Sequence, residues 1–245
     1  MKTVTDALVI KEMKTGEADR LITLLTKDNG IIKAYASGAK SIKSKRGSAT
    51  GLLSYSNFSL SKKGDTYRVT EATPIKLFFG TNTDIETLAV SQYFCELCLV
   101  FEPNGDNAEE FLRLILNSLY FITEKKKNLY MIKALTEMRV AAISGYCPSL
   151  VACEECGAFE DDIMYFDIAN GAVYCSKCNK DSSNIPLNKT LLSAIRHIVF
   201  SQFKDLYNFA IPEELSKTLS EITEKYIVFQ TDHRFTTLKF LNDIK

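Results

Sequence analysis

The sequence predicts a multidomain α+β protein. A five-stranded β-barrel is expected in residues 1–80, an all-helical domain in residues 81–147 and 181–245, and a four-cysteine ribbon inserted at residues 148–180. Three observations predict this order. The first 80 residues contain short apolar runs separated by turn formers, apolar residues take helical spacing from residue 83 onward, and two Cys-x-x-Cys pairs interrupt the helical part. A chain of 245 residues is long enough for two or three small domains.

The N-terminal region predicts five antiparallel strands. Asn29-Gly30 is a strong hairpin signal between the second and third strand, and Lys62-Lys-Gly-Asp65 forms the turn before the fifth. Five short strands in about 70 residues fit a small closed barrel of the oligonucleotide-binding (OB) type. The expected strands are Thr5–Met13, Leu21–Thr26, Ile31–Ala36, Leu52–Leu60 and Thr66–Glu71.

A long basic loop lies between the third and fourth expected strands. Residues 37–51 are rich in glycine and serine and carry the cations Lys40, Lys43, Lys45 and Arg46. A long cationic loop suits a phosphate backbone, which requires charge and small hydrogen-bond donors. Arg20 and Lys33 extend the predicted DNA-binding set, whereas Lys62 and Lys63 fit a solvated turn equally well. Tyr35, Tyr55, Phe58 and Tyr67 are candidates for stacking on bases, although each also fits the barrel core.

The zero net charge conceals a strong asymmetry. Residues 1–80 hold 14 Lys/Arg against 7 Asp/Glu, and the remaining residues hold 16 against 23. A basic front and an acidic back indicate a polyanionic partner for the front part. The alternative is that both are only solvated surface.

The helical part begins with a predicted capping box at Thr83-Asp-Ile-Glu86. Leu88–Phe101 is apolar almost all round, as in a buried helix. Further helices are expected over residues 108–123, 129–145 and 189–201, with Asn188 capping the last of these. A final helix is expected to start at Ile211-Pro212, since proline is favoured in a first turn.

The inserted segment predicts a zinc site. Two Cys-x-x-Cys pairs lie 18 residues apart, with expected strands Ile163–Asp167 and Gly171–Tyr174 between them. Two such turns can place four thiolates around one zinc ion, which leaves no open position for a substrate and makes the metal structural. The predicted ligands are Cys153, Cys156, Cys175 and Cys178, with one zinc per chain. Cys95 and Cys98 also have this spacing, but they lie in an apolar helix and are expected to be core.

The motifs of several enzyme classes are missing from the sequence. There is no phosphate-binding Gly-rich loop, no dinucleotide fingerprint and no His-Glu-x-x-His. We therefore expect a protein that is not an enzyme. The sequence has no apolar run of membrane-spanning length and no secretory signal at its start, and its seven cysteines fit a reducing compartment, so a cytoplasmic location is expected.

The chain resembles the bacterial RecO recombination-mediator family over nearly its whole length. The matching stretches are Ala7–Ile10, Gly16–Thr26, Gly30, Ala36–Lys40, Lys43–Arg46 and Arg234–Leu241. The resemblance implies a nucleoid-associated protein of DNA repair by homologous recombination, which binds single- and double-stranded DNA and anneals complementary strands. It also implies action with RecR, and help to RecA in displacing single-strand-binding protein, whose acidic C-terminal tail docks on the helical domain.

Two other functions are compatible with the sequence. One is a zinc-ribbon scaffold for protein contacts, with only incidental DNA binding. A nuclease is the third candidate, but the sequence offers no ligands for an open metal site.

Overall fold

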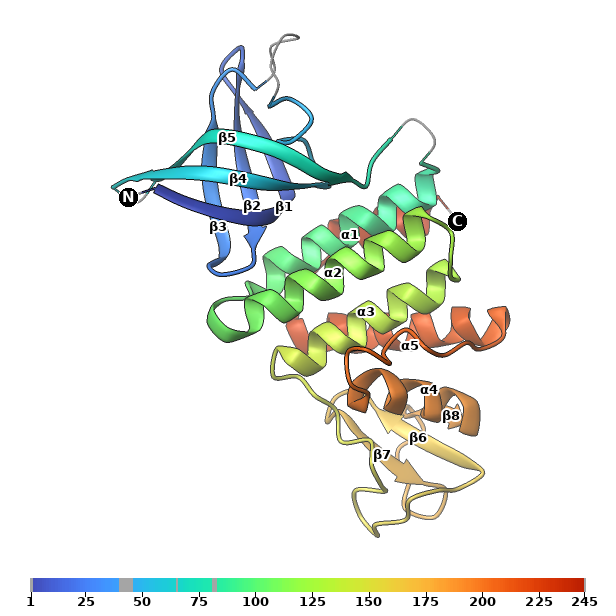
Figure 1. The fold of residues 1–245 in the computed structure, drawn as a ribbon. Coiled ribbons are helices and arrows are strands. Elements are labelled where there is room, and N and C mark those ends of the chain that lie inside the picture. Colours follow the sequence, from blue (N-terminus) through green and yellow to red (C-terminus); the bar gives the residue numbers. More distant parts are fainter. Residues whose placement is uncertain (1, 40–45, 65, 81–82, 245) are drawn as a thin grey trace. The chain divides into compact units, whose positions relative to one another are not determined.

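The computed structural model describes residues 2–39, 46–64, 66–80 and 83–244 (Figure 1). The chain forms two compact units, one of Met1–Glu124 with Phe235–Lys245 and one of Lys125–Arg234. A compact unit need not coincide with an independently folding domain, so the domain boundaries expected from the sequence stay a prediction. The two units are described separately.

The N-terminal strands close into a barrel, which confirms the predicted five-stranded architecture. The order around the barrel is β1-β2-β3-β5-β4, and β4 returns to pair with β1. All neighbouring pairs are antiparallel except the short β3–β5 contact, which joins Ala34 to Tyr67 and Tyr35 to Arg68 in parallel. The strands are β1 (Lys2–Thr15), β2 (Asp19–Thr26), β3 (Gly30–Ala36), β4 (Ser54–Lys63) and β5 (Thr66–Leu77).

Alternation along the strands separates the barrel core from a second buried layer. Ala7, Leu24 and Phe58 point into the core with other small and branched side chains. Leu8 and Leu25 follow Ala7 and Leu24 and therefore point outward, yet both are fully buried. Helices α1 (Ile85–Phe101) and α2 (Ala108–Thr123) contact β1 and β2, and so they cover this outer face.

Helix α1 starts one residue later than its predicted cap. The N-cap is Asp84, whose carboxylate accepts a 2.8 Å hydrogen bond from the Thr87 amide. The Thr83 hydroxyl instead accepts from the Gly80 amide at 3.2 Å. The predicted capping box at Thr83–Glu86 is therefore wrong, because the adjacent carboxylate takes the capping position.

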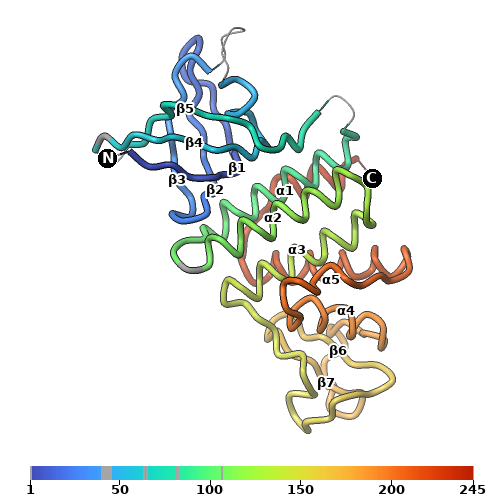
Figure 2. The backbone as a smooth tube through the Cα atoms, viewed as in Figure 1, coloured from blue at the N-terminus to red at the C-terminus, as the bar shows by residue number. Residues whose placement is uncertain are grey.

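A last short helix, α6 (Thr236–Asp243), was not predicted, so the helix expected at Ile211-Pro212 is not the final one. It packs on α1, and Figure 2 traces this C-terminal segment back to α1. The Glu96 carboxylate on α1 accepts 3.0 Å hydrogen bonds from the amides of Thr236 and Thr237, the first residues of α6. Burial opposes ionisation of Glu96, but these hydrogen bonds and those of the threonine hydroxyls outweigh it, so the pKa of Glu96 is lowered.

The second unit contains α3 (Leu129–Ile143), α4 (Lys189–Phe200) and α5 (Glu213–Thr231), and α3 packs on both of the others. A buried ionic cluster joins α3 to α5. The Lys133 ammonium lies 2.8 Å from carboxylate oxygens of Glu137 and Glu224, and Thr223 donates to Glu137 at 2.6 Å. Because Lys133 and Glu137 are almost fully buried, each charge depends on its partner, and removing either one would leave a costly unpaired charge.

The same unit holds a three-stranded sheet of order β7-β6-β8. Its strands are β6 (Ile163–Asp167), β7 (Ala172–Cys175) and β8 (Ile185–Asn188). The first two were predicted, and the third was not, because Pro186 argues against a strand. Pro186 lies in β8, which is an edge strand, and the missing backbone N–H of proline is tolerated there. Within the described ranges, none of the helices is both long and apolar enough to span a membrane.

We predict that Gly30→Ala destabilises the protein far more than Gly16→Ala. Both glycines have positive φ, +60° and +63°, where alanine costs about 1–2 kcal/mol. A Cβ at Gly30 would also overlap the Pro103 carbonyl oxygen and lie 2.9 Å from the Asn104 Cα, which adds about 1–3 kcal/mol, whereas no atom lies within 4 Å of a Cβ at Gly16. Urea unfolding measures both, and equal losses of stability would contradict this packing.

Candidate nucleic-acid surface and metal centre

The four predicted metal ligands meet at one point. Their four sulfur atoms lie within 4.8 Å of one another, and the Cys156 and Cys175 sulfurs are 3.7 Å apart. Each pair is held in a tight turn, where the Gly157 amide donates to the Cys153 carbonyl at 2.9 Å and the Cys178 amide to the Cys175 carbonyl at 3.1 Å. The second pair begins at the end of β7.

The chemistry of this cluster fits a structural metal ion. Four sulfur donors at this separation suit tetrahedral coordination and fill every position of a four-coordinate ion. Burial opposes ionisation of Cys153, but hydrogen bonds from the backbone of Cys175, Cys156 and Glu155 outweigh it and bring the pKa of Cys153 to about 6. A thiolate is the ligand form of cysteine. Although a backbone hydrogen bond opposes the shift at Cys156, hydrogen bonds with other thiols raise the pKa of Cys156 and Cys178, so a bound cation would have to displace protons from these two positions.

Arg196 of α4 holds the first cysteine turn to the helical part of its unit. Its guanidinium donates to the carbonyl oxygens of Leu150, Val151 and Phe159 at 2.7, 2.9 and 2.8 Å, and it lies 4.4 Å from the centre of the Phe159 ring. These carbonyls flank Cys153 and Cys156 on both sides. The sequence does not signal this role, because a single arginine on a helix resembles any solvated one.

The remaining cysteines take no part in the cluster. Cys95 and Cys98 are buried in α1, as predicted for core residues, and burial raises the pKa of Cys95 to about 12. The Cys98 thiol donates to the Phe94 carbonyl of its own helix at 3.1 Å. Cys147 is exposed and lies outside the group of four.

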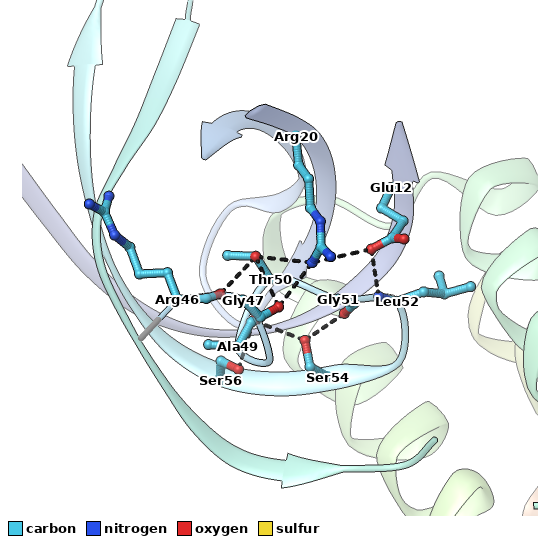
Figure 3. A network of polar contacts seen from close by, with 10 residues as sticks. All are labelled: Glu12, Arg20, Arg46, Gly47, Ala49, Thr50, Gly51, Leu52, Ser54 and Ser56. Carbon is cyan, nitrogen blue, oxygen red and sulfur yellow. Dashed lines mark hydrogen bonds and ion pairs between the residues drawn. The ribbon is translucent and has the colours of Figure 1, made fainter. Parts of the chain in front are cut away.

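Residues 37–39 and 46–51 of the basic loop are described, and Lys40, Lys43 and Lys45 lie outside the described residues. The second described stretch begins at Arg46, which donates to the Val69 carbonyl of β5 at 3.2 Å. Residues 47–53 then follow in turns against the barrel. Two hydroxyls of β4 fix these residues to the barrel, since Ser54 and Ser56 both donate to the Ala49 carbonyl, at 2.9 and 3.0 Å (Figure 3).

Arg20 and Glu12, on β2 and β1, clamp this stretch of the loop. The Arg20 Nη1 atom donates to the Gly47 carbonyl at 2.9 Å and lies 3.6 Å from the Glu12 carboxylate. That carboxylate accepts from the Leu52 amide at 3.1 Å. Figure 3 shows the two side chains converging on the loop while Arg46 extends away toward β5. Arg20 thus contacts the loop itself, and its side chain is only 20% exposed.

Lys33 lies away from the clamp, on the exposed side of β3. Tyr35 lies on the same side, 38% exposed, beside the exposed Arg68 of β5. Of the four aromatic candidates, Phe58 is fully buried in the core, whereas Tyr55 and Tyr67 are partly buried. Lys62 lies 5.4 Å from the centre of the Tyr67 ring.

Two residues of this surface were missed by sequence reasoning. Alternation along β5 would have put Arg68 on the outside with Lys33. Nothing in the sequence indicates a role for Glu12 in DNA binding, because an acidic residue is not expected to contribute to a basic surface.

We predict that Cys175→Ser abolishes stoichiometric metal binding, whereas Cys147→Ser leaves it unchanged. Removing one of four thiolates opens the coordination shell and removes metal-binding free energy that contributes to folding. Elemental analysis of both purified variants, with thermal unfolding before and after chelation, measures the effect. Full metal content in Cys175→Ser would contradict a four-thiolate site.

Comparison with known proteins agrees with this architecture. Residues 1–78 match the family described as "Recombination protein O N terminal" and residues 82–239 match "Recombination protein O C terminal". DNA repair protein RecO of Acetivibrio thermocellus is 32% identical over 241 residues, which cover 98% of this chain and 96% of that protein. The RecO proteins of Alkaliphilus metalliredigens and Dehalococcoides mccartyi are 25% and 26% identical, each over 98% of this chain and over 98% and 95% of their own lengths. The chain therefore belongs to the RecO family of DNA repair and recombination proteins.

Proposed function

We propose that this chain is a non-catalytic mediator of homologous recombination that binds single- and double-stranded DNA and anneals complementary strands. With RecR, it helps to load RecA onto DNA covered by single-strand-binding protein, whose C-terminal tail docks on the helical domain. The protein acts in the cytoplasm at the nucleoid. Family membership supports this role. The observation that carries the DNA-binding step is the clamp that holds a cationic loop on an OB-type barrel.

The barrel surface supplies the charge that a phosphate backbone requires. Arg46, Lys33, Lys62 and Arg68 are cations of the described surface, and Lys40, Lys43 and Lys45 precede Arg46 in the loop. Their contacts with phosphate would not depend on sequence, and this suits a protein that acts on any strand.

Arg20 has a positioning role in this proposal. Its guanidinium is engaged by the Gly47 carbonyl and the Glu12 carboxylate, so less of it is available to a phosphate. Arg20 affects DNA binding indirectly, because it fixes the C-terminal part of the loop to β1 and β2.

The metal is proposed to be one zinc ion per chain, held by Cys153, Cys156, Cys175 and Cys178. Four thiolates are the usual donor set of structural zinc. The ion would stabilise the ribbon by joining its two cysteine turns, and would take no part in DNA chemistry.

We predict that neutralising Lys40, Lys43, Lys45 and Arg46 together to glutamine weakens binding to an unstructured single strand. The slope of log affinity against log salt should flatten by roughly 0.7 for each phosphate that the loop no longer neutralises. Fluorescence anisotropy over a salt series measures the slope. Neutralising four exposed lysines of the other unit, Lys180, Lys204, Lys217 and Lys225, is the matched control and should leave the loop's contribution intact.

An unchanged slope in the loop variant would contradict the loop as a DNA contact. A protein that binds RecR and the single-strand-binding-protein tail but neither binds nor anneals DNA would instead support the scaffold function.

The direction in which DNA affinity changes in Glu12→Ala distinguishes a positioning role of the clamp from a purely electrostatic effect. Removing an acid beside DNA should tighten binding by simple electrostatics. Glu12→Ala instead frees Arg20 and the Leu52 amide, so we expect single-strand affinity to fall by about threefold to tenfold, the size of one or two hydrogen bonds.

Glu17→Ala is the control, because Glu17 is exposed in the same β1–β2 hairpin and should leave affinity unchanged or raise it. The same assay measures both variants. Tighter binding by Glu12→Ala would show that the clamp does not position the loop.

A further inference from the structure

A cavity of about 490 Å³ lies at the end of the barrel in the first unit, away from the clamp. One wall is the β2–β3 turn with the start of β3, including Asn29, Ile32 and Lys33. Tyr67 of β5 forms another, and Glu102, Pro103 and Asn104, which follow α1, close the third side. The volume is within the range of small-molecule sites.

Local contacts fix the walls of this cavity. The Thr26 hydroxyl accepts from the Asn29 amide at 3.0 Å and donates to the Gly30 carbonyl at 2.8 Å, which holds the turn. Gly30 is packed so closely against Pro103 that a Cβ could not be accommodated. The opposite wall is held by the Glu102 amide, which donates to the Cys98 carbonyl at 3.1 Å. The cavity is therefore preformed and need not be built by its ligand.

The lining matches the chemistry of a nucleobase. Ile32, Tyr67 and Pro103 line the cavity with apolar and aromatic surface on which a planar ring can lie. Asn29, Glu102 and Asn104 supply the donors and acceptors that base edges require. Lys33 is exposed at the same cavity, where its ammonium can meet a phosphate.

The cavity is continuous with the cationic surface of the barrel. Arg46 bonds to Val69 of β5, two residues from Tyr67. Between them, Arg68 is paired with Tyr35 on the exposed seam of β5 and β3, and Lys33 lies two residues before Tyr35 on the same side. A backbone laid from the loop along this seam would reach the cavity at Lys33.

We propose that this cavity receives one unpaired base of a single strand whose backbone follows the β3–β5 seam, with Tyr67 as its stacking platform. The inference rests on the proposed DNA binding and adds a base-specific contact to it. A base inside a duplex would first have to be unpaired and unstacked, at a cost of about a few kcal/mol, so the cavity favours binding of single strands.

Binding of oligothymidylate and of an abasic strand of equal length separates base from backbone contacts. We expect the intact protein to bind oligothymidylate at least about fivefold more tightly than the abasic strand. Tyr67→Leu should remove that ratio, whereas Tyr67→Phe, which keeps the ring beneath Lys62, should keep it. Tyr55→Leu, a partly buried tyrosine of β4 that is absent from the cavity lining, is the matched control and should also keep it. Lys33→Gln should weaken both strands equally.

Tyr67 also packs against the barrel core, so a second measurement uses the unaltered protein. A thymidylate strand with 5-iodouracil replacing one base should photocross-link to Tyr67, located by peptide mapping. Equal affinity for thymidylate and abasic strands, or cross-links only elsewhere, would overturn the base site. Salt-dependent binding that persisted in that case would leave the proposed function standing, whereas absence of all DNA binding would overturn both.

Discussion

Closure of the barrel depends on β1, the one strand that pairs with β2 along one edge and β4 along the other. A register shift between Val9 and Lys11 marks a bulge, beyond which β1 continues with β2 alone. The Leu53 amide bonds to the Val9 carbonyl at 2.9 Å beside this bulge. Glu12 lies on the projecting part, within reach of the loop exit. The geometry that closes the barrel is thus the same geometry that places the clamp.

Each of the two units buries an apolar core of its own. The barrel unit buries apolar layers on both faces of β1 and β2, with α1 and α2 covering the outside. The second unit also buries apolar side chains of α3, α4 and α5, and it adds two sets of polar links. These are the Lys133 cluster between α3 and α5 and the three carbonyl bonds of Arg196. Ion pairs add little net free energy, but in the Lys133 cluster the loss of one partner would be costly, because it would leave a buried charge alone.

Local patterns in the sequence predicted most of the fold. The strands β1–β5, the main helices and the four clustered cysteines follow from alternation, helical spacing and Cys-x-x-Cys turns. What could not be predicted depends on contacts between distant residues or on competition between neighbours. Asp84 caps α1 in place of the neighbouring Thr83, and β8 forms a strand although it contains Pro186. Helix α6 depends on a carboxylate of α1, which is distant in the sequence. In the candidate DNA surface, the role of Glu12 could not be predicted, because only the fold shows that it lies beside Arg20.

The buried cysteines of α1 have a consequence for metal acquisition. Cys95 and Cys98 precede the ribbon in the chain and have the spacing of a metal-binding pair, so in an unfolded chain they would compete for any ion that the four clustered cysteines can hold. Folding of α1 removes them from that competition, because burial keeps both thiols protonated and out of reach of solvent. If α1 folds first, an ion meets only the four cysteines of the ribbon. If the chain is still unfolded, the ion also meets the pair Cys95 and Cys98.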